Sequence, residues 1–147
     1  MSRRLSNGMV KSVFKANFQN LGSIRDFVGR SAQQAALSDR DIYAVQLAAD
    51  EASTNIIQHA YGGEGEDDIE IECEIIPGEL TIIFRDQGQS FDPASVPEPN
   101  VKAALGHRKI GGLGMYLIRN LVDEVHYATS ETGGNTLRLI KRVENRP

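Results

Sequence analysis

The sequence is poor in cysteine and contains no long apolar run. Its single cysteine, Cys73, cannot form an internal disulfide, which is typical of cytoplasmic proteins. No apolar stretch approaches the roughly 20 residues that a membrane helix needs, and none follows the basic N-terminal residues as in a signal peptide. A strong positive charge is also missing: the net charge is −4, whereas nucleic-acid binding requires a basic face. These absences predict a cytoplasmic protein that binds neither membranes nor nucleic acid directly.

The length of 147 residues suits one domain, 1–147, with a single hydrophobic core, and no internal repeat is visible. Hydrophobic periodicity and turn residues predict the order of its elements. They are a strand at 9–16, helices at 21–36 and 39–61, strands at 69–75 and 80–84, a helix at 113–122, and strands at 125–129 and 135–143.

Particular residues mark the ends of these elements. Ser38 is predicted to be the N-cap of the second helix, with Asp41 as its capping-box partner. Pro77-Gly78 turns one alternating strand into the next, so the two should form an antiparallel hairpin. The aperiodic stretch 89–110 is predicted to be a lid or binding loop. We expect a two-layer α/β (α+β) sandwich with a largely antiparallel sheet, helices on one face and a polar second face.

Glu51 and Asn55 lie one turn apart on the same face of the second predicted helix. The Asn55 amide oxygen could bind a hard cation such as Mg²⁺ together with substrate phosphates, and the Glu51 carboxylate could accept a proton from an attacking hydroxyl. A solvated helix face is the commoner explanation of such a pair. The small residues around it, such as Ala49 and Ala52, favour a functional face instead.

A second motif, Asp86-Gln87-Gly88-Gln89-Ser90-Phe91-Asp92, follows the second strand of the predicted hairpin. An aspartate at a strand end can accept a hydrogen bond from an exocyclic amine, and a glycine lets the backbone approach a flat ring. A plain Asp-Gly turn is the alternative.

A third motif, Gly111-Gly112-Leu113-Gly114, leads directly into the last predicted helix. Free backbone N–H groups and the positive end of the helix dipole can bind phosphate, although a flexible hinge would look the same. The motif is neither the lysine-containing P-loop nor the dinucleotide fingerprint. Lys102, His107, Arg108 and Lys109 precede it and are either solvated charges or lid cations that close over a triphosphate.

These three motifs, in this order, resemble the nucleotide-binding boxes of the GHKL ATPase superfamily, from about residue 13 to residue 139. Ser90 stands where the wider superfamily usually has a second glycine, and it matches the anti-sigma factor serine/threonine kinases of the RsbW type. The resemblance implies a single histidine-kinase-like ATPase domain of the Bergerat type. Its sheet would be mixed but mostly antiparallel.

The resemblance also implies a role for each matching residue. Glu51 would be the general base, Asn55 the Mg²⁺ ligand and Asp86 the residue that recognises adenine. Gly88 would flank the ring. The remaining nucleotide-binding residues would be Ser90, Lys109, Gly111, Gly112, Leu113, Gly114 and, from the last box Gly134-Asn135-Thr136-Leu137, Thr136, which would help to hold the adenine.

By the same resemblance, the protein uses ATP and Mg²⁺ to phosphorylate a serine of a STAS-domain anti-anti-sigma protein, and it sequesters a sigma factor. Relatives tend to form homodimers, so a homodimer is implied as well. Two alternatives stay open from the residues alone. The domain could be a nucleotide-binding regulatory module with little or no catalysis, or a simple ATPase that transfers the phosphoryl group to water.

Overall fold

The computed structural model of the chain describes residues 3–6, 8–90, 110–131 and 133–143, with side chains for 8–90, 115–131 and 133–143. The strands are β1 (Arg3–Ser6), β2 (Met9–Lys15), β3 (Asp68–Ile76), β4 (Glu79–Asp86), β5 (Glu124–Thr129) and β6 (Asn135–Arg142). The helices are α1 (Leu21–Gln34), α2 (Asp39–Asn55) and α4 (Ile110–Leu121). A 3₁₀ turn (Phe18–Asn20) precedes α1, and a π-helical turn (Ile56–Ala60) continues α2.

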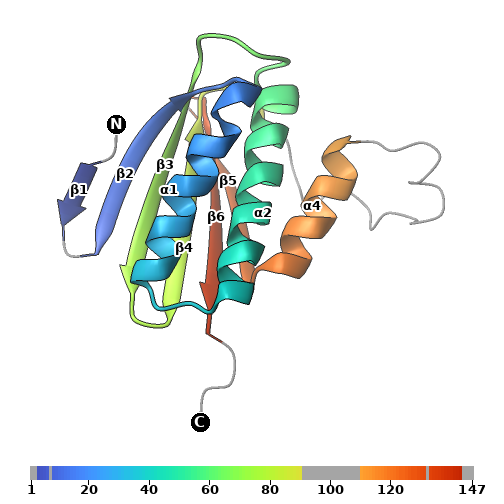
Figure 1. Ribbon diagram of the computed structural model, residues 1–147. Helices are drawn as coiled ribbons and strands as arrows, with labels where there is room; N and C mark the ends of the chain where they lie inside the picture. Colours follow the sequence, from blue (N-terminus) through green and yellow to red (C-terminus); the bar gives the residue numbers. More distant parts are fainter. Residues whose placement is uncertain (1–2, 7, 91–109, 132, 144–147) are drawn as a thin grey trace.

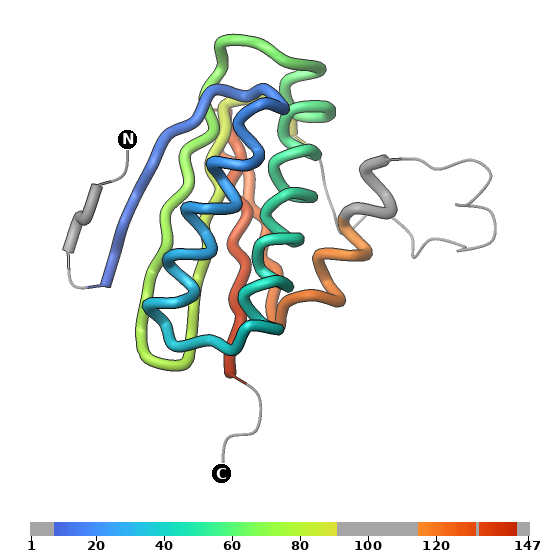
Figure 2. Tube along the Cα trace, viewed as in Figure 1, coloured from blue at the N-terminus to red at the C-terminus, as the bar shows by residue number. Residues whose placement is uncertain are grey.

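The strands form one six-stranded sheet in the order β1-β2-β3-β4-β6-β5. Every neighbouring pair of described strands is antiparallel, so the sheet is antiparallel throughout rather than mixed. α1 and α2 lie side by side across one face, and α4 lies beside α2 (Figure 1). The chain trace shows the same two layers (Figure 2). The predicted two-layer α+β fold is confirmed.

The predicted elements are present, with three differences. β1, which the hydrophobic pattern does not indicate, pairs with β2. The helix predicted at 39–61 changes to a π-helix after Asn55. α4 begins at Ile110, so the glycines at 111–114 belong to the helix instead of preceding it. Of the predicted lid at 89–110, residues 91–109 lie outside the described part of the chain.

Alternation along the central strands separates an apolar face from a polar one. The residues of β3 that face the helices are fully buried: Ile69, Ile71 and Cys73. On the other face, Arg85 Nη1 donates to Glu70 Oε2 and Glu72 Oε1, both at 2.9 Å. The face is therefore polar as predicted, although Ile83 and Ile140 are buried on it as well.

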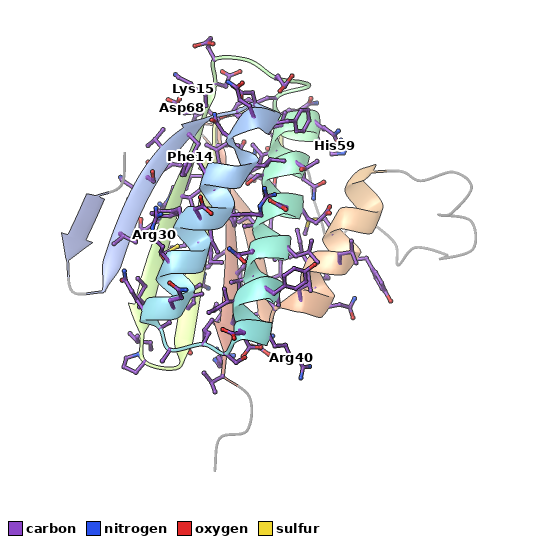
Figure 3. All side chains as sticks on the ribbon, viewed as in Figure 1. Phe14, Lys15, Arg30, Arg40, His59 and Asp68 are labelled. Atoms are coloured by element: carbon purple, nitrogen blue, oxygen red, sulfur yellow. The ribbon has the colours of Figure 1, made fainter. Side chains whose placement is uncertain are left out.

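α1 presents one face to the sheet because its apolar residues recur at helical spacing. The residues on that face are all buried: Ile24, Phe27, Val28, Ser31 and Ala35. Phe27 meets Phe14 of β2 edge-on, with ring centroids 6.0 Å apart, which anchors α1 to β2. At the same end of the sheet, Lys15 Nζ lies 3.0 Å from Asp68 Oδ1 (Figure 3).

α2 begins at the predicted cap, where the Asp41 N–H donates to Ser38 Oγ at 3.1 Å. The other half of the predicted capping box is wrong. The Asp41 carboxylate instead lies 3.7 Å from Lys141 Nζ of β6, and both residues are buried. This ion pair fixes the start of α2 over the sheet. None of the described helices is long and apolar enough to cross a membrane.

Candidate functional site

Asn55 is the last residue of α2, one turn after the half-buried Glu51. It is only 7% exposed, and its amide Nδ2 and Oδ1 have no hydrogen-bond partner among the described residues. An unpaired buried polar group costs about 1–3 kcal/mol, so native proteins rarely keep one without a ligand, an ion or a water to complete it. Asn55 also lines a cavity, and that is where such a group would bind.

Asp86 is the last residue of β4 and is 5% exposed. Its Oδ1 accepts hydrogen bonds from the backbone N–H of Gly88 and from Asn135 Nδ2, both at 2.8 Å. Burial raises the pKa of the Asp86 carboxyl above its usual range, and the two hydrogen bonds oppose that rise because they favour the charged form. Both described bonds end on Oδ1, which leaves Oδ2 as the acceptor for a ligand.

Gly88 packs directly against the π-helical turn. A Cβ at this position would lie 2.4 Å from the Ala60 carbonyl oxygen and 2.8 Å from the Ala60 Cβ. The next residue, Gln89, donates its N–H to the same carbonyl at 2.7 Å. The structure therefore requires glycine here for a close approach of two backbones, and this contact joins the loop after β4 to the end of α2.

Tyr61 ties the same loop to the sheet. Its hydroxyl donates to the Asp68 carbonyl at 2.6 Å and accepts the N–H of Gln87 at 2.9 Å. Burial raises the pKa of this phenol above its usual value. His59, in the π-helical turn, is exposed (Figure 3). The π-helical turn thus holds the loop through Ala60 and Tyr61.

Strand register decides which residue of the last box faces Asp86. Asn135 is the direct partner of Asp86 across β4 and β6, whereas Thr136 pairs with Arg85 on the polar face of the sheet. Thr136 is therefore placed on the face opposite to Asp86, which differs from its predicted place in the pocket. Asn135 takes that place instead. The alternation that buries Leu137 and Leu139 could have indicated it, because Asn135 shares their face.

One cavity brings these groups together. It is lined from α2, the π-helical turn, β4, α4, β5 and β6 by Ala52, Asn55, Ile56, Ala60, Asp86, Met115, Tyr127, Asn135 and Leu137. Its walls are mostly aliphatic, with a carboxylate, two amides and a phenol as polar groups. A small apolar slot with a few well-placed polar groups suits a flat heteroaromatic ligand.

The structure places some of the predicted site residues at the cavity and others away from it. Asn55 and Asp86 line the cavity; Gly88 adjoins it through Ala60. Ser90 is exposed at the last described position of the loop. The remaining members, Gly111, Gly112, Leu113 and Gly114, are described as the start of α4, and Lys109 lies outside the described residues. The residues that sequence reasoning missed are Asn135, Tyr127 and Met115.

The chain is similar to proteins of a known family. Residues 14–141 match the model of the histidine kinase-like ATPase domain. The chain is 31% identical over 109 residues to the serine-protein kinase RsbW of Bacillus velezensis, covering 71% of this chain and 68% of that protein. It is 26% identical over 148 residues to the anti-sigma F factor of Clostridium novyi, covering 96% and 99%.

Solved structures show the same fold. The RsbU and RsbW domains of a Mycobacterium tuberculosis protein match with a TM-score of 0.64 and 18% identity, over 95% of this chain and 33% of that one. The SiaB–SiaC complex of Pseudomonas aeruginosa matches with a TM-score of 0.61 and 14% identity, over 88% of both chains.

The chain therefore belongs to the histidine kinase-like ATPase family, in the branch of the RsbW serine-protein kinases. The predicted family is confirmed, and the names of the curated relatives support the predicted serine-kinase activity.

Proposed function

We propose that this protein binds ATP in the cavity between α2 and β4 and transfers its γ-phosphoryl group to a serine of a partner protein. The observation that carries the proposal is the pairing of two groups in one apolar cavity. Asp86 offers a buried acceptor at one wall, and Asn55 offers an unpartnered amide at another.

Asp86 is suited to bind the adenine ring. Its Oδ2 can accept a hydrogen bond from the exocyclic amine of the base, while the aliphatic walls of Ile56, Met115 and Leu137 contact the ring faces. The joined loop and π-helical turn keep Asp86 in place through Gly88 and Ala60.

The donor set around Asn55 fits a Mg²⁺ ion that also binds nucleotide phosphates. Among the described residues no group of three or more His, Cys, Asp or Glu could hold a metal by itself. Magnesium needs few protein oxygens when phosphates supply the others, and the orphaned Asn55 Oδ1 is such an oxygen. When bound, the ion would neutralise charge on the phosphates. The first backbone N–H groups of α4, at Gly111, Gly112 and Leu113, could bind the phosphates as well.

Glu51 would act as the general base from its position one turn before Asn55. The serine oxygen of the partner attacks the γ-phosphorus, the bond from that phosphorus to the ADP oxygen breaks, and Glu51 takes the hydroxyl proton. Positioning supplies most of the acceleration in such a transfer, because little covalent chemistry is asked of the protein. Ser90, Lys109 and Gly114 stay candidate nucleotide contacts from sequence.

The partner follows from the family. A curated relative that covers nearly the whole chain is named an anti-sigma F factor. We propose that this protein phosphorylates a STAS-domain anti-anti-sigma protein and binds a sigma factor, as a homodimer in the cytoplasm. Phosphorylation of the antagonist would free the kinase to hold the sigma factor.

Phosphotransfer from γ-labelled ATP to a purified STAS-domain protein from the same organism tests the proposal. The wild type should label the partner on serine. Glu51→Gln should lower the rate by about 10²–10⁴-fold, because it removes the base, yet bind ATP nearly as well. Glu131→Gln, in the exposed turn after β5, is the matched control and should change neither.

The other outcomes separate the alternatives. ATP binding without transfer to any STAS-domain protein would identify a regulatory module. Release of phosphate in the absence of a partner would identify an ATPase. Failure of the wild type to bind ATP would rule out all three.

A further inference from the structure

The side chain of Asn135 sits at the centre of a hydrogen-bonded network next to the cavity. Its Nδ2 donates to Asp86 Oδ1 at 2.8 Å and contacts the carbonyl oxygens of Gly88 and Gln89 at 3.3 and 3.1 Å. Its Oδ1 accepts the hydroxyl of Tyr127 at 2.9 Å. Asn135 is 4% exposed, so water cannot replace these partners easily.

The chemistry of the partners allows only one orientation of the Asn135 amide group. Carbonyl oxygens and an ionised carboxylate can only accept hydrogen bonds, so the amide group that faces them must be the NH₂. The amide oxygen must then face Tyr127, whose hydroxyl has to donate. Reversing the amide would bring Asn135 Oδ1 against Asp86 Oδ1, two acceptors with no proton between them.

Among the described residues, the hydroxyl of Tyr127 is the donor that completes the amide oxygen of Asn135. With it, both faces of the Asn135 amide are satisfied, and the amide is held against Asp86. Without this hydroxyl, the buried Asn135 Oδ1 loses its donor, and only the NH₂ end of the amide stays hydrogen-bonded. Tyr127 and Asn135 come from neighbouring strands, β5 and β6, and both line the cavity with Asp86.

We propose that Tyr127 is a positioning residue that sets nucleobase selectivity, because it holds Asn135 so that Asp86 presents a fixed acceptor to the base. This inference rests on the proposed function, since the base is that of the bound ATP. A fixed acceptor matches the 6-amino group of adenine, which donates. It rejects the 6-oxo group of hypoxanthine or guanine, which would set one acceptor against another.

The sharpest probe is a pair of nucleotides that differ at this position of the base. ATP carries an amino group there, and inosine triphosphate (ITP) carries an oxo group in its place. Wild-type affinity for both is measured by competition against a fluorescent ATP analogue. The wild type should prefer ATP by more than about 100-fold, because ITP leaves the carboxylate unpaired.

Tyr127→Phe removes one oxygen atom and should weaken ATP binding by about three- to tenfold, the loss expected for one neutral hydrogen bond. ITP binding should hardly change, because ITP has no bond to Asp86 to lose. The ATP-to-ITP preference therefore falls, whereas general loosening of the fold would weaken both nucleotides together. Tyr43→Phe is the matched control, since Tyr43 is 67% exposed on α2.

A double-mutant cycle with Asn135→Ala tests the connection. Asn135→Ala should reduce the ATP-to-ITP preference further than Tyr127→Phe does, and adding Tyr127→Phe to it should change ATP affinity by less than about twofold. Thermal melts confirm that each variant is folded. If Tyr127→Phe does not fold, Asn135→Ala alone decides, because an unchanged preference there overturns the inference.

Three results overturn the inference while the proposed function stands. The first is a Tyr127→Phe variant with wild-type preference for ATP over ITP, and the second is additive loss in the double variant. The third is a wild type that binds ATP and ITP equally. A wild type that binds neither nucleotide overturns the proposed function together with the inference.

Discussion

At the scale of single residues, Asp86 shows a conflict between stability and ligand binding. Burial raises the pKa of its carboxyl, so the folded protein binds this proton more tightly than the unfolded chain does. The protonated form therefore favours folding. That contribution is complete below the unfolded pKa and is lost as the pH rises through the folded pKa. At neutral pH the buried charge works against stability, and under the proposed function it is retained because it binds adenine.

Asp86→Asn should therefore raise the melting temperature of the ligand-free protein at neutral pH and abolish ATP binding. The Asn Oδ1 can keep both hydrogen bonds from Gly88 and Asn135, while its NH₂ would face the amino group of the base, donor against donor. The gain in melting temperature over wild type should shrink as the pH is lowered toward the acid range, where Asp86 itself is protonated.

Thermal melts over a pH series and calorimetric ATP titrations measure both effects. Asp67→Asn, in the exposed loop before β3, serves as the control for removal of one negative charge. A lower melting temperature for Asp86→Asn would show that the carboxylate is favourable in the fold.

At the scale of elements, the junction between the π-helical turn and the loop after β4 determines the shape of the site. In a π-helical turn the backbone hydrogen bonds span five residues instead of four, and such turns are often found at functional sites. Here it brings the Ala60 carbonyl to Gly88 and Gln89 and the Tyr61 hydroxyl to Gln87. These contacts thus hold the loop that follows Asp86 against the turn that follows Asn55.

Gly88→Ala should separate these two elements, because its Cβ would lie 2.4 Å from a backbone oxygen that cannot move aside cheaply. We expect a loss of about 1–3 kcal/mol in the free energy of unfolding, the usual cost of overpacking, and weaker ATP binding. Urea unfolding and nucleotide titration measure the two.

The control for Gly88→Ala is Gly65→Ala, whose Cβ would meet Asp67 Oδ2 only at 3.9 Å. If both variants had the same free energy of unfolding, the close approach at Gly88 would not contribute to stability.

At the scale of the whole molecule, the ion pair between Asp41 and Lys141 joins the first turn of α2 to the last strand. Asp41 is 5% exposed and Lys141 9% exposed. A buried pair contributes little net stability when intact, but removal of one partner leaves the other charge buried alone. The helix N-terminus at Asp41 offsets part of that penalty.

Lys141→Met should consequently destabilise the fold by about 3 kcal/mol, and the double variant Asp41→Asn/Lys141→Met should recover a large part of the loss. Lys11→Met is the matched control. Its side chain is 34% exposed and lies 3.5 Å from Glu70, and the expected loss is below about 1 kcal/mol. Similar losses for the two lysines in urea unfolding would contradict a special role for the buried pair.

Much of the fold could be predicted from sequence because its signals are local. The alternation around Ile69 and Ile71, the Ser38 cap and the helical spacing of Ile24 and Phe27 each indicate one element without reference to the rest. β1 was missed because a short edge strand has no strong period of its own. The π-helical turn was missed because its composition is that of an ordinary helix.

The candidate site could be predicted in part for the same reason. Asn55 and Asp86, which both line the cavity, belong to motifs that are visible in the sequence, whereas the role of Glu51 stays a prediction. Thr136 rather than Asn135 was predicted to hold the adenine, because the motif alone does not show which of two neighbouring residues faces the site. Strand pairing places the two side chains on opposite faces of the sheet.

The amino-acid sequence was sufficient to predict most of the elements, the family and two cavity residues, Asn55 and Asp86, because periodicity and motif chemistry act over a few residues. Only the tertiary structure decided how those residues meet. Asn135 reaches Asp86, 49 residues away, because β6 lies beside β4. Gly88 contacts Ala60 because α2 ends in a π-helical turn. Tyr127 enters the site because β5 pairs with β6, and long-range pairing of this kind leaves no local pattern in the chain.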